Sequence, residues 1–131
     1  MPYPIRKLTP NLIVSSVERS LAFYCDVLGF SKSATVPDEP PFVFGIVQSG
    51  DVEIFFNAVA AATEEYPAMA GKPLGGTLTL YCEVSGIEQI YAELKDRVKV
   101  TMPLEKKWYG VTEFAFEDPD GWVLTFGQPE Q

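Results

Sequence analysis

The 131 residues of this chain include no histidine, and this absence limits the chemistry that the chain can perform. Histidine is the commonest nitrogen ligand for transition metals and the usual general base near neutral pH. A serine or cysteine triad of the usual kind is therefore excluded, although lysine-based and N-terminal variants remain open. Carboxylates, hydroxyls and two thiols are the groups left for catalysis or binding.

The two cysteines give no sign of a redox or metal motif. Cys25 and Cys82 lie far apart, in a predicted helix and a predicted strand, and neither belongs to a closely spaced pair. Buried, reduced thiols are the simplest interpretation.

The net charge and the hydropathy of the chain argue against two classes of partner, nucleic acids and membranes. Ten Lys and Arg against eighteen Asp and Glu leave a net charge of −8, which repels nucleic-acid phosphates, so no nucleic-acid partner is expected. No apolar run approaches the roughly 20 residues that cross a bilayer, so no membrane association is expected. The N-terminal segment MPYPIRKLTP lacks the apolar core of a secretory signal, and we expect a cytoplasmic location.

An internal repeat organises the chain. A shift of 70 positions matches one set of residues with another: Thr9, Val14, Ser15, Glu18, Ala22 and Asp26 with Thr79, Val84, Ser85, Glu88, Ala92 and Asp96. Both copies read as an apolar strand followed by Ser-x-x-Glu, the pattern of a capping box at a helix start. The first helix carries an apolar stripe from Val17 to Leu28, and Gly29 ends it.

Shorter extended runs follow each predicted helix. They are joined in part by turns at residues 49–51 and 118–121, and they comprise residues 32–36, 42–48, 51–57, 98–102, 111–117 and 122–127. Each half is then a strand, a helix and three strands, over residues 5–57 and 77–128. The alanine-rich segment 58–76 is a linker or a flap. Because neither half buries enough apolar surface alone, we predict one domain over residues 1–131.

Three segments carry a resemblance to a known family: TPNLIVSSVERSLAFYCDVLGF, GDVEIFFN and WYGVTEFAFEDPDGWVLTFGQ. The chain resembles the vicinal oxygen chelate superfamily of glyoxalases, extradiol dioxygenases and bleomycin-resistance proteins. The resemblance implies an α+β fold in which two βαβββ modules form a curved, eight-stranded mixed sheet around a cleft. It also implies a homodimer.

The resemblance places the metal-ligand positions of the family on residues that are poor ligands. These are Thr9 and Phe55 in the first module and Thr79 and Thr125 in the second. Neutral hydroxyls and a phenyl ring supply no charge to compensate a divalent ion. We therefore expect no metal and no cofactor, and the chain looks most like the bleomycin-resistance branch, which binds a drug without a metal.

Strand alternation from these positions predicts the lining of the cleft. It adds Asn11, Glu53, Tyr81 and Glu113, with Trp108 nearby, while alternate residues such as Leu12, Phe56, Leu78 and Phe126 should face the helices. Aromatic rings beside unpaired acids, among which Glu53 is the best placed, suit a cationic or amphipathic aromatic ligand.

Two main functions remain open at this point, and an accessory or sensing subunit with a vestigial cleft is a third possibility. The first is a metal-free small-molecule binding protein that sequesters its ligand by stoichiometric capture. The second is a glyoxalase- or dioxygenase-like enzyme with a non-standard site in which Glu53, Glu83 and Glu113 act as oxygen donors or as acid–base groups. Metal-dependent stabilisation that is lost in Glu53→Gln would favour the enzyme.

Overall fold

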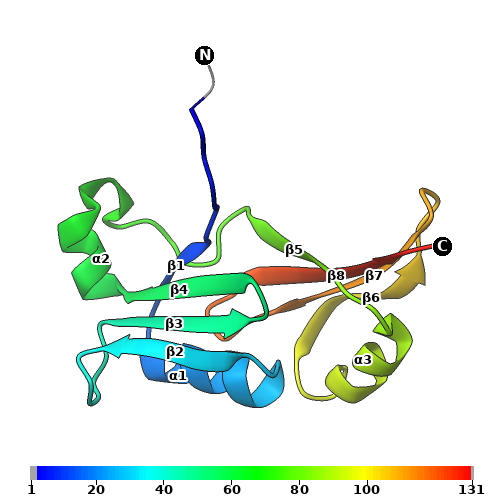
Figure 1. The fold of residues 1–131 in the computed structure, drawn as a ribbon, viewed down its shortest axis with the longest axis horizontal. Helices are drawn as coiled ribbons and strands as arrows, with labels where there is room; N and C mark the ends of the chain where they lie inside the picture. Colours follow the sequence, from blue (N-terminus) through cyan, green and yellow to red (C-terminus); the bar gives the residue numbers. More distant parts are fainter. Residues whose placement is uncertain (1–2, 131) are drawn as a thin grey trace. The chain divides into compact units, whose positions relative to one another are not determined.

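The computed structural model describes residues 3–130 (Figure 1). Met1 and Pro2, at the start of the segment analysed above for a secretory signal, and Gln131, at the end of the predicted domain, lie outside the described residues. The described chain divides between Lys72 and Pro73 into two compact units, called unit 1 and unit 2 here, and this division falls inside the predicted linker 58–76.

Unit 1 is a four-stranded mixed sheet with helical segments. Its strands follow the order β1-β4-β3-β2, with β1 parallel to β4 and the other pairs antiparallel. In chain order its elements are β1 (Asn11–Val14), α1 (Val17–Ala22), the π-helix η1 (Phe23–Val27), β2 (Ser31–Val36), β3 (Phe44–Ser49), β4 (Val52–Ala58), α2 (Val59–Glu65) and the 3-10 helix η2 (Pro67–Met69). The alanine-rich segment after β4 is therefore partly helical.

Unit 2 repeats this topology. Its strands follow the order β5-β8-β7-β6, again with one parallel pair, β5 and β8. Its elements are β5 (Thr79–Glu83), α3 (Ile87–Leu94), β6 (Lys99–Lys106), β7 (Val111–Glu117) and β8 (Val123–Pro129). The predicted α+β class and the strand–helix–three-strand plan are confirmed, and hydrogen bonding groups the eight strands as two sheets of four.

The repeat of 70 positions is visible in the strand register. In unit 1 Asn11 pairs with Phe55, and in unit 2 Tyr81 pairs with Thr125 at the equivalent positions. The antiparallel pairs do not follow the offset, because two residues connect β3 to β4 whereas five residues connect β7 to β8. The repeat therefore holds for the parallel strand pair and shifts across the hairpin.

The helix starts also keep the offset, but the predicted capping boxes are wrong. Helix α1 is capped by Ser16, whose hydroxyl accepts from the Arg19 amide at 3.2 Å. Helix α3 begins after Gly86, which has no side chain, and the amide of Ile87 donates instead to Oε1 of Gln128 at 2.9 Å. The Ser-x-x-Glu pattern thus located both helices and misplaced the cap by one residue.

The core of each unit lies between its first helix and its sheet. Helix α1 contacts β3 and β4, and α3 contacts β7 and β8. The predicted helix-facing residues are largely confirmed, since Leu12, Val14, Ile54, Phe56, Phe114, Phe116 and Leu124 are buried. Leu78 was predicted to face the helix and is instead 51% exposed, because it precedes the first residue of β5.

Candidate functional site

The nine predicted site residues divide between the two units. Unit 1 holds Thr9, Asn11, Glu53 and Phe55, and unit 2 holds Thr79, Tyr81, Trp108, Glu113 and Thr125. In each unit the strand positions lie on the sheet face that alternates with the buried, helix-facing residues. We call these two surfaces the open face of unit 1 and the open face of unit 2.

On the open face of unit 2, the two threonines at the family's ligand positions contact each other. Thr79 lies on β5 and Thr125 on β8, and their hydroxyl oxygens are 2.7 Å apart in a hydrogen bond. Thr125 is buried. The exposed Thr79 therefore satisfies the hydroxyl of Thr125, which has little access to water.

The most distinctive group of this face is Glu113 on β7. Its side chain is only 5% exposed, and its two carboxylate oxygens accept hydrogen bonds at 2.7 Å from the hydroxyls of Tyr81 and Tyr109. The bond to Glu113 raises the pKa of Tyr81 to about 12, and the same cause raises the pKa of Tyr109. Both phenols are therefore protonated donors at neutral pH, since their ordinary pKa is about 10.

Gly127 makes this arrangement possible. It pairs with Glu113 across β7 and β8, and a Cβ built on it would lie 2.2 Å from the Tyr81 hydroxyl. Only a glycine leaves room for the Tyr81 ring to cross β8 and reach Glu113. Sequence reasoning missed Gly127, and the available signal was a glycine inside a strand, which often marks close approach of another group.

Trp108 lies at the tip of the β6–β7 hairpin and is 94% exposed. Its ring meets that of Tyr109 edge to face, with centroids 5.3 Å apart and planes at 90°. Tyr109 therefore connects Trp108 to Glu113, a role that the sequence did not indicate. Tyr109 thus links three of the residues that the sequence singled out, Tyr81, Trp108 and Glu113.

The open face of unit 1 is built from amides rather than from acids. Asn57 is buried and donates to Oδ1 of Asn11, and Asn11 donates to the hydroxyl of Tyr66, 3.3 Å away, beyond the end of α2. Phe55 pairs with Asn11 in the register, and its amide donates to the carbonyl of Pro10 at 2.9 Å. Thr9 directly precedes this contact and is partly buried.

Glu53 is not the unpaired acid that the sequence analysis expected. Its carboxylate forms an ion pair with the ammonium group of Lys7, from the segment before β1. The pairing was not predictable because Lys7 lies 46 positions away in an extended segment without a repeating pattern. The charge of Glu53 is therefore largely compensated, and Glu113 becomes the leading acidic group.

The residues at the family's metal-ligand positions do not fit a divalent ion. Thr79 and Thr125 are engaged with each other, and neither Thr9 nor Phe55 carries a charge. Within residues 3–130, no group of three or more Cys, Asp or Glu side chains is placed to hold a metal. The donor chemistry at these positions therefore favours organic contacts.

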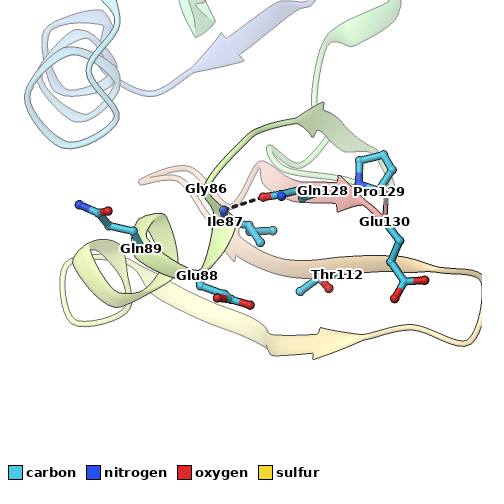
Figure 2. Close-up of a pocket in the computed structure, with 8 residues that line it drawn as sticks. All are labelled: Gly86, Ile87, Glu88, Gln89, Thr112, Gln128, Pro129 and Glu130. Carbon is cyan, nitrogen blue, oxygen red and sulfur yellow. Dashed lines mark hydrogen bonds between the residues drawn. The ribbon is translucent and has the colours of Figure 1, made fainter.

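A cavity of about 490 Å³ lies elsewhere in unit 2, and none of the nine predicted residues lines it (Figure 2). It is bordered by the start of α3 and the ends of β7 and β8, through Gly86, Ile87, Glu88, Gln89, Thr112, Gln128, Pro129 and Glu130. Thr112 and Gln128 alternate with Glu113 and Gly127, which places the cavity on the helix side of the sheet. Its only cross-element bond shown in Figure 2, from Ile87 to Gln128, serves the helix start.

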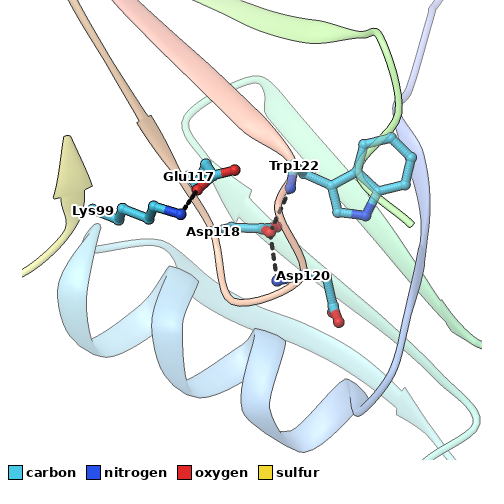
Figure 3. A network of polar contacts seen from close by, with 5 residues as sticks. All are labelled: Lys99, Glu117, Asp118, Asp120 and Trp122. Carbon is cyan, nitrogen blue, oxygen red and sulfur yellow. Dashed lines mark hydrogen bonds and ion pairs between the residues drawn. The ribbon is translucent and has the colours of Figure 1, made fainter. Parts of the chain in front are cut away.

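The turn between β7 and β8 fixes the strands of the open face. Oδ1 of Asp118 accepts from the amides of Asp120 and Trp122, both at 2.9 Å, and Lys99 pairs with Glu117 at 2.8 Å (Figure 3). An aspartate that caps its own turn in this way pins a hairpin register. The opposition of Glu113 and Gly127 depends on that register.

A duplicated βαβββ plan with a polar and aromatic open face defines a class of small binding and catalytic domains. A family model described as the Glyoxalase/Bleomycin resistance protein/Dioxygenase superfamily matches residues 8–126. The chain therefore belongs to this superfamily, as its resemblance had implied.

Three similar proteins illustrate the range of the family. A bleomycin resistance protein of Geobacillus stearothermophilus is 27% identical over 128 residues, covering 91% of this chain and 93% of the relative. A glyoxalase/bleomycin resistance protein/dioxygenase from Nocardioides has a TM-score of 0.82 at 20% identity, covering 100% of this chain and 87% of the other. The bleomycin-binding protein of bleomycin-producing Streptomyces verticillus, solved with copper(II)-bleomycin, has a TM-score of 0.66 at 22% identity, covering 98% and 100%.

One further finding concerns membranes. No helix within residues 3–130 is long and apolar enough to span a bilayer.

Proposed function

We propose that this chain is a small-molecule binding protein of the bleomycin-resistance type, which holds a cationic or amphipathic aromatic ligand without a metal of its own. The observation that carries the proposal is the open face of unit 2, where Tyr81, Tyr109 and Trp108 present rings next to the buried carboxylate of Glu113. Rings give stacking and cation–π contacts, each contributing about 0.5 to 2 kcal/mol.

The relatives support the same proposal. The similar protein of Geobacillus stearothermophilus is named for bleomycin resistance, and that of Streptomyces verticillus for bleomycin binding. Stoichiometric capture requires neither turnover nor a catalytic base, which agrees with a sequence without histidine. We further propose that the open face of unit 1, with Thr9, Asn11, Glu53 and Phe55, contributes to ligand binding, and that the protein acts as a cytoplasmic homodimer.

The enzymatic alternative needs carboxylates that are free to bind a metal or to transfer protons. Glu53 is engaged by Lys7, and both oxygens of Glu113 accept from phenols. These contacts would have to break before either group could act. The binding function therefore requires fewer changes to the observed geometry.

Calorimetric titration tests the proposal. Metal-free bleomycin should bind stoichiometrically, and the heat should be unchanged after the protein is treated with a chelator. Within matched pairs of one ring size, such as 9-aminoacridine and acridine-9-carboxylate, the cation should bind more tightly. Binding that disappears with the chelator would overturn the metal-free proposal, and tighter binding of the anions would overturn the charge assignment.

Two simpler measurements test the proposed homodimer and the proposed action in the cytoplasm. One chain has a mass of 14.5 kDa, and light scattering should give twice this value. The mass of a single chain would overturn the proposed homodimer. Expression in the cytoplasm of a bleomycin-sensitive bacterium should raise its survival in the drug. If the protein binds bleomycin but survival is unchanged, it does not confer resistance to this drug, and its role is to bind another molecule.

A further inference from the structure

The carboxylate of Glu113 has no cation beside it within the described residues. The groups that hydrogen-bond to it are the neutral phenols of Tyr81 and Tyr109. The three lysines of the same hairpin are paired with other acids, Lys99 with Glu117, Lys106 with Glu130 and Lys107 with Glu105. A buried negative charge is stabilised by an opposite charge, and no ion pair of the described residues supplies one to Glu113.

Three exposed aromatic rings are linked to this carboxylate. Tyr81 is 54% exposed, Tyr109 is 50% exposed and Trp108 is 94% exposed, although Glu113 is almost fully buried. Trp108 and Tyr109 meet edge to face, with their planes at 90°. The hydroxyls of Tyr81 and Tyr109 are held on the same carboxylate, so the three rings form one exposed aromatic cluster.

The hydrogen bonds to Glu113 make these rings better partners for a cation. A phenol that donates to a carboxylate is polarised toward negative charge on its oxygen and ring. The face of an aromatic ring attracts cations, and quaternary ammonium ligands are recognised by such groups of rings. The buried charge therefore acts through the rings and needs no direct contact with a bound cation.

We propose that Tyr81, Trp108 and Tyr109, held over Glu113, form an aromatic cage for an alkylated ammonium group. The proposal rests on the proposed function and specifies the ligand chemistry of the same face. A primary ammonium group needs hydrogen-bond acceptors, and the oxygens of Glu113, each of which accepts from one phenol, are almost fully buried. An alkylated ammonium group has little or no such need, and it contacts the rings through its methyl groups.

Three small probes test the cage directly. Choline carries a trimethylammonium group, 3,3-dimethylbutan-1-ol has the same shape without charge, and ethanolamine carries a primary ammonium. We expect choline to bind at least ten-fold more tightly than the other two, measured by NMR titration of the backbone amides of Tyr81 and Gly127, which all the variants below retain. Equal affinity for choline and the neutral alcohol would overturn the cage, and so would tighter binding of ethanolamine.

Substitutions test which residues are responsible for choline binding. Glu113→Gln should weaken choline binding at least five-fold and leave the neutral alcohol unchanged, because only the charge is removed. If this variant does not fold, Trp108→Ala serves instead, since so exposed a side chain contributes little to folding. Tyr3→Ala, at another exposed aromatic residue outside unit 2, is the matched control and should bind as the unaltered protein does. Unchanged choline binding in Trp108→Ala would overturn the proposal.

The test separates the cage from the proposed function. If metal-free bleomycin binds while choline shows no preference over the neutral alcohol, the cage is wrong and the binding function stands. If neither choline nor bleomycin nor 9-aminoacridine binds, the cage and the proposed function both fail.

Discussion

The two units place different chemistry on equivalent backbone positions. Asn11 and Asn57 of unit 1 correspond, at the offset of 70, to Tyr81 and Gly127 of unit 2. In unit 1 the two amides bond to each other across β1 and β4. In unit 2 the glycine leaves a space that the tyrosine ring crosses to reach Glu113. The repeat therefore keeps the register of the parallel strand pair, while each face has its own side-chain chemistry.

A second difference concerns how each face handles its acid. Glu53 in unit 1 is neutralised by Lys7, whereas Glu113 in unit 2 is held by phenols and keeps an uncompensated charge. Under the proposed function, unit 2 therefore supplies the attraction for a cation.

The cores of the two units should differ in how much they depend on equivalent phenylalanines. Phe56 is fully buried against Tyr24, while its counterpart Phe126 is partly exposed. We expect Phe56→Ala to lower the free energy of unfolding by about 3–5 kcal/mol and Phe126→Ala to lower it by less. Urea unfolding measures both, and an equal or larger loss for Phe126→Ala would contradict the packing described for the units.

Gly127→Ala should be the most disruptive small change on the open face of unit 2. Because the added methyl group collides with the Tyr81 ring, we expect a loss of about 1–3 kcal/mol in the free energy of unfolding. In a Tyr81→Ala background the same change should cost much less, since the colliding ring is gone. A double-mutant cycle measures this coupling, and additive effects would show that Tyr81 does not occupy this space.

The helix caps give a smaller effect. Ser16→Ala removes the cap of α1 and should cost about 1 kcal/mol. Ser15→Ala, the matched control at the position that the capping-box pattern favoured, should cost about 0.5 kcal/mol or less. Thermal or urea unfolding compares the two variants. A larger loss of stability for Ser15→Ala would show that Ser15 caps α1, as the capping-box pattern predicted.

Alkaline pH should affect unit 2 through Tyr81, whose ring is half exposed, so the effect is the smallest of the four. The pKa of Tyr81 is raised to about 12 in the folded protein by the bond to Glu113, against about 10 in an unfolded chain. The stability that this hydroxyl contributes is therefore fully present below pH 10 and is lost between pH 10 and 12. The corresponding residue Asn11 does not titrate.

Urea unfolding at several pH values measures this loss. Tyr81→Phe should show a shallower decline above pH 10 than the unaltered protein, because it has no such hydroxyl to lose. Tyr109, which Glu113 also holds, titrates in both proteins and cancels in the comparison. Identical pH profiles would contradict the hydrogen bond between Tyr81 and Glu113.

Much of the fold follows from the sequence because local patterns are enough to define it. Valine-rich strand ends, apolar stripes and turn residues located both βαβββ modules, and the repeat aligned their parallel strand pairs. The cap of α3 was misplaced because Gln128 reaches the start of this helix from a strand 41 positions away, which no local pattern records.

The site was predictable only in part. Alternation along the strands gave Tyr81, Glu113, Thr79 and Thr125 the same face, since alternation depends only on the backbone. It could not show that Glu53 meets Lys7, or that Tyr109 reaches Glu113, because both depend on where long side chains turn. Gly127 matters because it has no side chain, and this is evident only once the position of the Tyr81 ring is known.

The location of ligand binding distinguishes the open face of unit 2 from the cavity on the helix side. Amide chemical shifts should be followed by two-dimensional NMR while metal-free bleomycin is added to the protein. We expect the largest changes on the open face of unit 2, at Tyr81, Glu113 and Gly127, as the proposed function requires. Changes confined to Ile87 and Gln128, around the cavity on the helix side, would contradict it.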